Sequence, residues 1–154
     1  MNWPAPQSQW IWLNRKTSSV NQFVEFRKTY NLRQGIKNSR VFISVDSDYE
    51  LWVNGNFIGW NQFPNWPKAK TFNTHDVDHL LKRGKNCVAV RVRYRGKDFS
   101  THAKGKPGFL FALQQKDHTV LSSDETWRCR LSKTYHSGPM PWVSRQLDFT
   151  LAYD

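Results

Sequence analysis

The sequence is poor in cysteine, in acidic residues and in long apolar runs. Its two cysteines, Cys87 and Cys129, are far apart in 154 residues, so they match neither a zinc-ligand pattern nor a disulfide framework, and we expect two small buried thiols. No apolar run approaches the ~20 residues of a membrane-spanning helix, so no membrane partner is expected. The opening MNWPAPQSQW lacks the basic-then-apolar order of a signal peptide, which leaves a cytoplasmic protein or a secreted one whose leader has been removed.

Motifs of catalysis and nucleotide binding are also missing. Residues 95–108 (RGKDFSTHAKGKPG) contain glycines and lysines without the GxxxxGK[ST] order of a phosphate loop, so we expect a long exposed loop there. His75 and His79 lack the glutamate of an HExxH zinc motif. Asp46 and Asp48 flank a bend and are expected to cap turns, with a structural calcium ion as the weaker interpretation. No residue is assigned a catalytic role, and no cofactor is expected.

Positive charge and aromatic side chains are what the sequence has in excess. Lysine and arginine number 23 against 12 acidic residues, which favours an anionic partner such as an acidic polysaccharide, a nucleic acid or an acidic neighbouring domain. Arg91, Arg93 and Arg95 alternate along one strand pattern. The chain has neither an aromatic RNA-binding signature nor a recognition helix, so nucleic acid is the less favoured partner.

Period-two alternation of β-branched and aromatic residues dominates the chain and predicts strands. The predicted strands cover 22–32, 40–46, 49–60 (a hairpin), 70–73, 86–95, 108–115, 119–123, 127–131 and 146–153. One short helix is predicted within 74–86, with Thr74 as its N-cap and Gly84 as its C-cap. We therefore expect an all-β fold, a single β-sandwich or jelly-roll domain over residues 1–154 with about eight or nine strands. Its predicted core contains Val41, Ile43, Val45, Leu51, Val88, Val90 and Val92.

The segment YELWVNGNFIGW, residues 49–60, is apolar on both faces of its predicted hairpin. Asn54-Gly55 predicts a two-residue type I′ turn, which places Leu51 opposite Ile58 and Trp52 opposite Phe57. The residues expected on the core side are Tyr49, Leu51, Val53, Ile58 and Trp60.

Trp52 and Phe57 then point to the other side, and three explanations remain open for them. They could lie under the loop FPNWP (63–67), stack against sugar rings, or contact another domain, since exposed aromatic patches usually mark contacts. The candidate contact residues are Trp52, Phe57, Trp60, Trp66, Arg91 and Arg93.

Several segments occur in a recognisable order. They are SQWIW (8–12), FVEFRKTYNL (23–32), ISVDSDYELWVNGNFIG (43–59), HDVDHLLKRGKNCVAVRV (75–92), PGFLFAL (107–113), SSDETWR (122–128) and LDFTLAYD (147–154). In this order they resemble the N-terminal accessory module of bacterial α-L-rhamnosidases, a galactose-binding-like jelly roll, and similar domains of other large glycosidases.

This resemblance implies a non-catalytic, carbohydrate-binding-type module of a glycoside hydrolase that packs beside the catalytic barrel of the same polypeptide. It also implies that the catalytic acids lie elsewhere, because no residue of this chain matches them. Saccharide contact stays open. The alternative function is an autonomous binding module for an anionic polymer, either an acidic polysaccharide or a nucleic acid.

Overall fold

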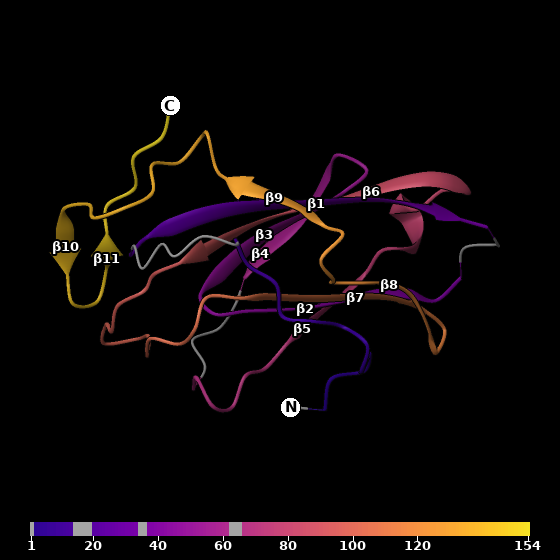
Figure 1. The fold of residues 1–154 in the computed structure, drawn as a ribbon, viewed down its shortest axis with the longest axis horizontal. Helices are drawn as coiled ribbons and strands as arrows, with labels where there is room; N and C mark the ends of the chain where they lie inside the picture. Colours follow the sequence, from indigo (N-terminus) through magenta and orange to yellow (C-terminus); the bar gives the residue numbers. More distant parts are fainter. Residues whose placement is uncertain (1, 14–19, 34–36, 62–65) are drawn as a thin grey trace.

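The computed structural model describes residues 2–13, 20–33, 37–61 and 66–154 and shows two antiparallel sheets packed face to face (Figure 1). The larger sheet has the strand order β4-β3-β6-β1-β9. Its strands are β1 (Gln22–Leu32), β3 (Asp48–Val53), β4 (Asn56–Asn61), β6 (Gly84–Tyr94) and β9 (Arg128–Leu131). The smaller sheet has the order β5-β2-β7-β8. Its strands are β2 (Ser39–Val45), β5 (Asn73–Asp76), β7 (Phe109–Gln115) and β8 (His118–Ser122).

The core fills the space between the two sheets, as the alternation of the sequence predicts. The seven residues expected there are all at most 1% exposed: Val41, Ile43, Val45, Leu51, Val88, Val90 and Val92. Aromatic rings complete the core, with Phe109 in contact with Phe26, Phe111 and Trp127. The predicted all-β sandwich is therefore confirmed.

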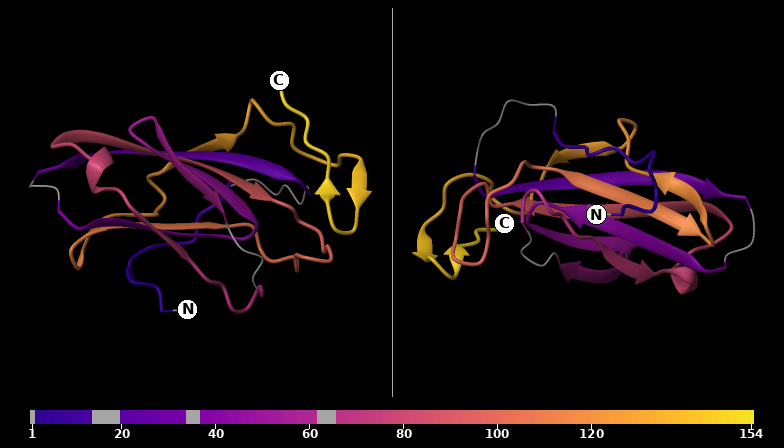
Figure 2. Two further views of the ribbon diagram at one scale, coloured as in Figure 1. Left: turned by 180° about the vertical axis from the view of Figure 1, so that it is seen from behind. Right: turned by 90° about the horizontal axis from the view of Figure 1, so that it is seen from below.

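The N-terminal segment lies along the four-stranded sheet (Figure 2). The Ser8 hydroxyl donates a hydrogen bond to the Phe111 carbonyl at 3.1 Å, and Ile11 pairs with Phe109 through two backbone hydrogen bonds of 3.0 Å. This cover explains why six of the seven residues of β7 are buried. A strand buried on both faces reads as a continuous apolar run, here FLFAL.

The helix predicted within 74–86 is wrong in extent and in type. Thr74 lies in β5, which pairs with β2, and only a single 3-10 turn follows at η1 (Asp78–Leu80). Asp78, the first residue of this turn, connects it to the neighbouring strand. The Asp78 carboxylate accepts backbone hydrogen bonds from Asn38 and Ser39 at 2.8 and 2.7 Å, which holds the start of β2.

The predicted turn of the β3–β4 hairpin is confirmed. Asn54 and Gly55 have φ values of 52° and 83°, the two positive values that a type I′ turn requires. The Asn54 side chain adds hydrogen bonds to Leu80 and Cys87 that fix the turn on β6.

The two cysteines are free, but the prediction that both are buried is wrong. Cys87 is half-buried and Cys129 is exposed, since it lies on β9 at the edge of the larger sheet. Among the described residues no helix is long and apolar enough to cross a membrane.

Residues 132–154 leave β9 and fold over one end of the larger sheet, where β10 (Trp142–Ser144) pairs with β11 (Asp148–Phe149) (Figure 1). Asp148 anchors this segment through a two-pronged ion pair with Arg93, with both contacts at 3.1 Å, and a further pair with Arg95. Tyr135 stacks on Phe23 with ring centroids 4.8 Å apart. Within the described residues, no other segment covers the rest of that sheet's outer surface.

Candidate functional site

The open outer surface of the five-stranded sheet is built from two rows of residues that run across all five strands. The register of the strands aligns Trp60, Glu50, Arg91, Glu25 and Arg130 in one row. It aligns Phe57, Trp52, Ala89, Arg27 and Arg128 in the next. We call these ten residues the arginine–tryptophan face. Directly opposed residues of neighbouring strands share a face and interact, so the two rows are physical neighbours.

The first row alternates in charge across four strands. Arg91 contacts Glu50 on one side, with Nη1 and Oε2 2.8 Å apart, and approaches Glu25 on the other, with Nε and Oε1 3.9 Å apart. Glu25 in turn accepts a hydrogen bond from Arg130 at 2.8 Å. An isolated surface pair contributes little, but a connected network in a partly buried row fixes the side chains in place. Both carboxylates are engaged by guanidinium groups, so neither is poised as a free general acid.

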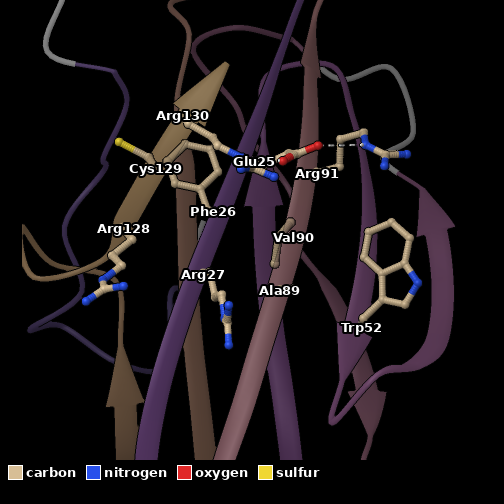
Figure 3. A pocket seen from close by; sticks show the side chains of 10 residues that line it. All are labelled: Glu25, Phe26, Arg27, Trp52, Ala89, Val90, Arg91, Arg128, Cys129 and Arg130. Carbon is tan, nitrogen blue, oxygen red and sulfur yellow. Dashed lines mark hydrogen bonds and ion pairs between the residues drawn. The ribbon is translucent and has the colours of Figure 1, made fainter. Parts of the chain in front are cut away.

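The second row has a hollow at its centre because Ala89 is small and its neighbours are large. A depression of about 440 Å³ lies here, with Trp52 on one side and Arg27 and Arg128 on the other (Figure 3). The Arg91 guanidinium lies 5.5 Å from the centroid of the Trp52 ring and 4.7 Å from that of Tyr135. Such cation–π contacts hold the arginine against both rings.

The structure corrects the predicted side of Trp60. A β-bulge between Leu51 and Trp52 places Leu51 opposite Gly59, so Ile58 is an extra residue. Trp60 then pairs with Glu50 and lies on the outer surface, where it is 74% exposed. A bulge inserts one residue into one strand, and one residue is enough to exchange the two faces.

The predicted outward position of Trp52 and Phe57 is confirmed. They are paired across the hairpin with ring centroids 5.5 Å apart, and Phe57 is 54% exposed. Trp52 is half-buried. The loop 63–67, one of the explanations for these aromatics, lies mostly outside the described residues, of which only Trp66 and Pro67 belong to it.

Two further candidates are not among these ten residues. Arg93 lies on the same outer surface, in the next row along β6, and lines a smaller depression with Trp60 and Arg91. Asp148 and Asn21 bind its guanidinium under the C-terminal segment. Burial lowers the pKa of Arg93, and the Asp148 carboxylate opposes that effect. Trp66 is exposed and lines a separate depression with residues 98–103.

The two weak metal candidates are each paired with a cation. Asp46 is buried and contacts the Lys70 ammonium at 2.7 Å, and Asp48 contacts Arg95 at 3.0 Å. Burial raises the pKa of Asp48, while the Arg95 and Arg93 guanidiniums lower it in part. No group of three or more His, Cys, Asp or Glu side chains that could hold a metal ion occurs in the described part of the chain.

Residues 34–140 match the family model of the α-L-rhamnosidase N-terminal domain. The chain belongs to this family. A GH78 family rhamnosidase from Bacillus sp. GL1 has a TM-score of 0.89 at 25% identity, over 100% of this chain and 16% of that one. An α-L-rhamnosidase from Formosa agariphila is 27% identical over 67% of this chain and 13% of its own length. A β-galactosidase from Priestia megaterium is 32% identical over 55% of this chain and 8% of its own length.

This N-terminal domain therefore spans about a sixth or less of the length of these relatives. Its arginine–tryptophan face includes six residues that were not singled out from the sequence. They are Glu25, Arg27, Glu50, Ala89, Arg128 and Arg130. The alternation in a strand such as RCRL (128–131) indicates which side chains point outward, but which strands are neighbours is decided only by the sheet order.

Proposed function

We propose that this N-terminal domain is a non-catalytic accessory module of an α-L-rhamnosidase-type glycoside hydrolase. We further propose that its arginine–tryptophan face packs against the catalytic domain of the same polypeptide. The observation that carries the proposal is an open sheet face with three aromatic residues, two of them more than half exposed, beside a fixed network of arginines. Tryptophan and arginine are the residues most enriched at the energetic centres of protein interfaces.

A protein surface fits this face better than a sugar does. A sugar site needs a few convergent polar groups with free hydrogen-bonding capacity. Here the Arg91 guanidinium already donates a hydrogen bond to Glu50 and makes cation–π contacts with the rings of Trp52 and Tyr135, so little of its hydrogen-bonding capacity is left for a sugar. A row of alternating charges that crosses four strands instead presents a broad pattern, which an oppositely patterned protein surface can match.

We also propose that the chain by itself has no catalytic role, and the geometry of this face supports that proposal. Glycoside hydrolysis needs two carboxyl groups that face each other across the sugar, ~5–10 Å apart and accessible to it. On this face Glu25 and Glu50 are both held by arginines. The 154-residue chain should therefore not hydrolyse an aryl rhamnoside. Turnover by the purified chain that disappears when one acid is replaced would overturn this part of the proposal.

Trp60→Ala tests the contact, because this side chain is 74% exposed and its removal leaves no cavity. In the 154-residue chain we expect the free energy of unfolding to change by less than about 0.5 kcal/mol. In the polypeptide that carries both domains we expect the contact to weaken by about 2 kcal/mol or more if Trp60 is a central residue of the interface. The measurement is calorimetric unfolding of both proteins.

The matched control is Trp66→Ala, which removes an exposed tryptophan from a different surface. It should leave unfolding of the two-domain protein unchanged. Equal behaviour of the Trp60 and Trp66 variants would contradict the proposed contact. A Trp60 variant that keeps full two-domain stability but loses binding on a glycan array would assign the face to saccharide instead.

A further inference from the structure

A second surface feature lies apart from the arginine–tryptophan face and shares no residue with it. It is a groove of about 680 Å³ lined mainly by Trp10, Pro67, Lys68, Lys70, Lys104 and Lys106. Three separate segments meet there: the N-terminal segment, residues 67–70 before β5, and the long loop between β6 and β7. The groove volume is within the ~300–1,000 Å³ of small-ligand sites.

The aromatic wall of the groove is held rigidly in place. Backbone pairing of Ile11 with Phe109 fixes the chain beside Trp10. A Cβ atom on Gly108 would come within 2.7 Å of Cε3 of the Trp10 ring, so the ring lies directly against the glycine backbone. Trp10 is nevertheless 46% exposed, which leaves much of the indole surface open. A fixed and partly open indole is the surface on which the apolar C–H face of a pyranose ring stacks.

One of the four lysines that line the groove, Lys70, has its charge neutralised by a buried carboxylate. The Asp46 carboxylate is buried and pairs with the Lys70 ammonium at 2.7 Å. A Cβ atom on Gly105 would come within 1.9 Å of Asp46 Oδ1, so the loop backbone passes directly over this carboxylate. The loop backbone therefore covers Asp46 on the groove side, and Lys70 is the one groove-lining lysine that is paired with its carboxylate, which also lies 3.6 Å from Nε2 of His102.

Three lysines remain to give the groove its charge. Lys68, Lys104 and Lys106 are exposed, and no acidic residue lines the groove with them. The next acid on the loop, Asp98, accepts a hydrogen bond from the backbone N–H of Lys104 at 2.7 Å. Clustered charges of one sign raise the local concentration of an oppositely charged ligand, and the net charge of +11 adds to this field.

We propose that this groove binds an anionic saccharide, with a sugar ring against Trp10 and a carboxylate or sulfate group paired with Lys68, Lys104 and Lys106. Nucleic acid fits the groove less well. Single strands are held by several aromatic side chains on which successive bases stack, and this groove offers one tryptophan. The proposal is independent of the contact proposed for the arginine–tryptophan face.

Calorimetric titration of the 154-residue chain tests this binding. The ligands are tetragalacturonate, which carries carboxylates, a κ-carrageenan tetrasaccharide, which carries sulfates, and tetragalacturonate with its carboxyl groups reduced to alcohols. We expect one of the two anionic ligands to bind and the reduced ligand to bind at least about tenfold more weakly, because hydrogen bonds to charged groups are lost. Binding of tetragalacturonate would identify the acidic group as a carboxylate, and binding of the carrageenan tetrasaccharide would identify it as a sulfate. Binding should weaken as salt is raised from about 0.05 to 0.5 M.

The role of the lysines is tested with the double variant Lys104→Gln/Lys106→Gln. The matched control is the double variant Lys82→Gln/Lys116→Gln. Both double variants remove two exposed positive charges, but Lys116 lies at the far end of β7 from the groove, where its N–H bonds to Asn38. We expect about tenfold weaker binding in the first pair and less than about twofold in the control.

Trp10→Ala should also weaken binding by about tenfold, with loss of the fluorescence change that a ligand on the indole produces. Four results would overturn the proposal: neither anionic ligand binds at millimolar concentration, the reduced ligand binds equally, the control pair loses as much affinity, or the Trp10 variant, still folded by circular dichroism, binds normally. Tighter binding of an oligothymidine that depends on the same lysines would assign the groove to nucleic acid and overturn it too.

Discussion

The outer surfaces of the two sheets differ in what lies over them. On β7, Leu110 and Ala112 point away from the core yet are 3% and 0% exposed, because the N-terminal segment lies along that sheet. On β6, Ala89 and Arg91 occupy the corresponding outer positions, and nothing in the described chain covers Ala89. A strand with two covered faces carries apolar residues throughout, whereas a strand with one covered face alternates. The alternation along β6 therefore indicates a surface that the described chain leaves uncovered, and this is the surface for which we propose a contact.

The largest expected effect comes from placing a charge on the outer face of β7, beneath the N-terminal segment. Ala112→Asp buries a carboxylate without a partner and should lower the free energy of unfolding by about 3 kcal/mol or more. Ala89→Asp makes the same change on the open face, beside Arg27 and Arg91, and should stay within about 0.5 kcal/mol of the wild type. Urea unfolding of both variants measures the difference. Similar losses in the two variants would mean that the two outer faces are equally buried.

The two ends of the larger sheet's outer surface differ in the same way. Asp148 is 5% exposed and holds Arg93 and Arg95 under the C-terminal segment. Asp148→Asn keeps the shape of the side chain and tolerates the φ of 71°. It leaves the partly buried Arg93 without a carboxylate partner and Arg95 with Asp48 alone, so we expect a loss of about 2 kcal/mol.

Glu50→Gln is the matched change on the open part of the surface. It weakens a pair with Arg91 that is partly exposed, so the loss should be below about 1 kcal/mol. Urea unfolding, together with the rate of proteolysis within 132–154, compares the two variants. Faster proteolysis is expected for the Asp148 variant alone, and an equal rate in both would show that the ion pair does not hold the segment.

The turn of the β3–β4 hairpin should tolerate only residues that adopt a positive φ at position 55. Gly55→Val forces a β-branched residue to a φ of 83° and should cost about 1 kcal/mol or more, although no atom obstructs the new side chain. Gly55→Asn should cost less, because asparagine adopts positive φ more readily. Thermal unfolding compares them, and an unchanged melting temperature in the valine variant would contradict the type I′ turn.

The smallest expected effect concerns pH. Burial lowers the pKa of His102 below its usual 6.5, although nearby Asp46 opposes this. The unfolded chain therefore takes up a proton before the folded one does, so stability is lost as pH falls below about 6.5 toward the folded pKa. The free energy of unfolding should fall less between pH 7.5 and 5 in His102→Gln than in the wild type. Parallel pH profiles for the two proteins would contradict this.

Particular residues show how far the sequence could be read. Most strands, the core valines and the turn at Asn54-Gly55 were predicted because period-two patterns and turn chemistry are local properties. The strands expected over 70–73 and 146–153 were wrong in extent, since β5 is Asn73–Asp76 and only Asp148–Phe149 is strand in the last segment. Trp60 was placed on the wrong side because a single bulged residue reverses the alternation without a mark in the sequence. The helix within 74–86 was wrong because Thr74 gains more from pairing with β2 than a short isolated helix could supply.

The sequence by itself determined that this is an all-β domain and, where no bulge interrupts a strand, which side chains point outward. It also carried the family resemblance, because both depend on the local order of residues. Only the tertiary structure decided which outer faces are covered and which strands are neighbours. It brought Trp10, Lys68 and Lys104 to one groove from three distant segments. The physical reason is that burial and electrostatic fields depend on distances in space, and those are set by the sheet order and by where the terminal segments lie.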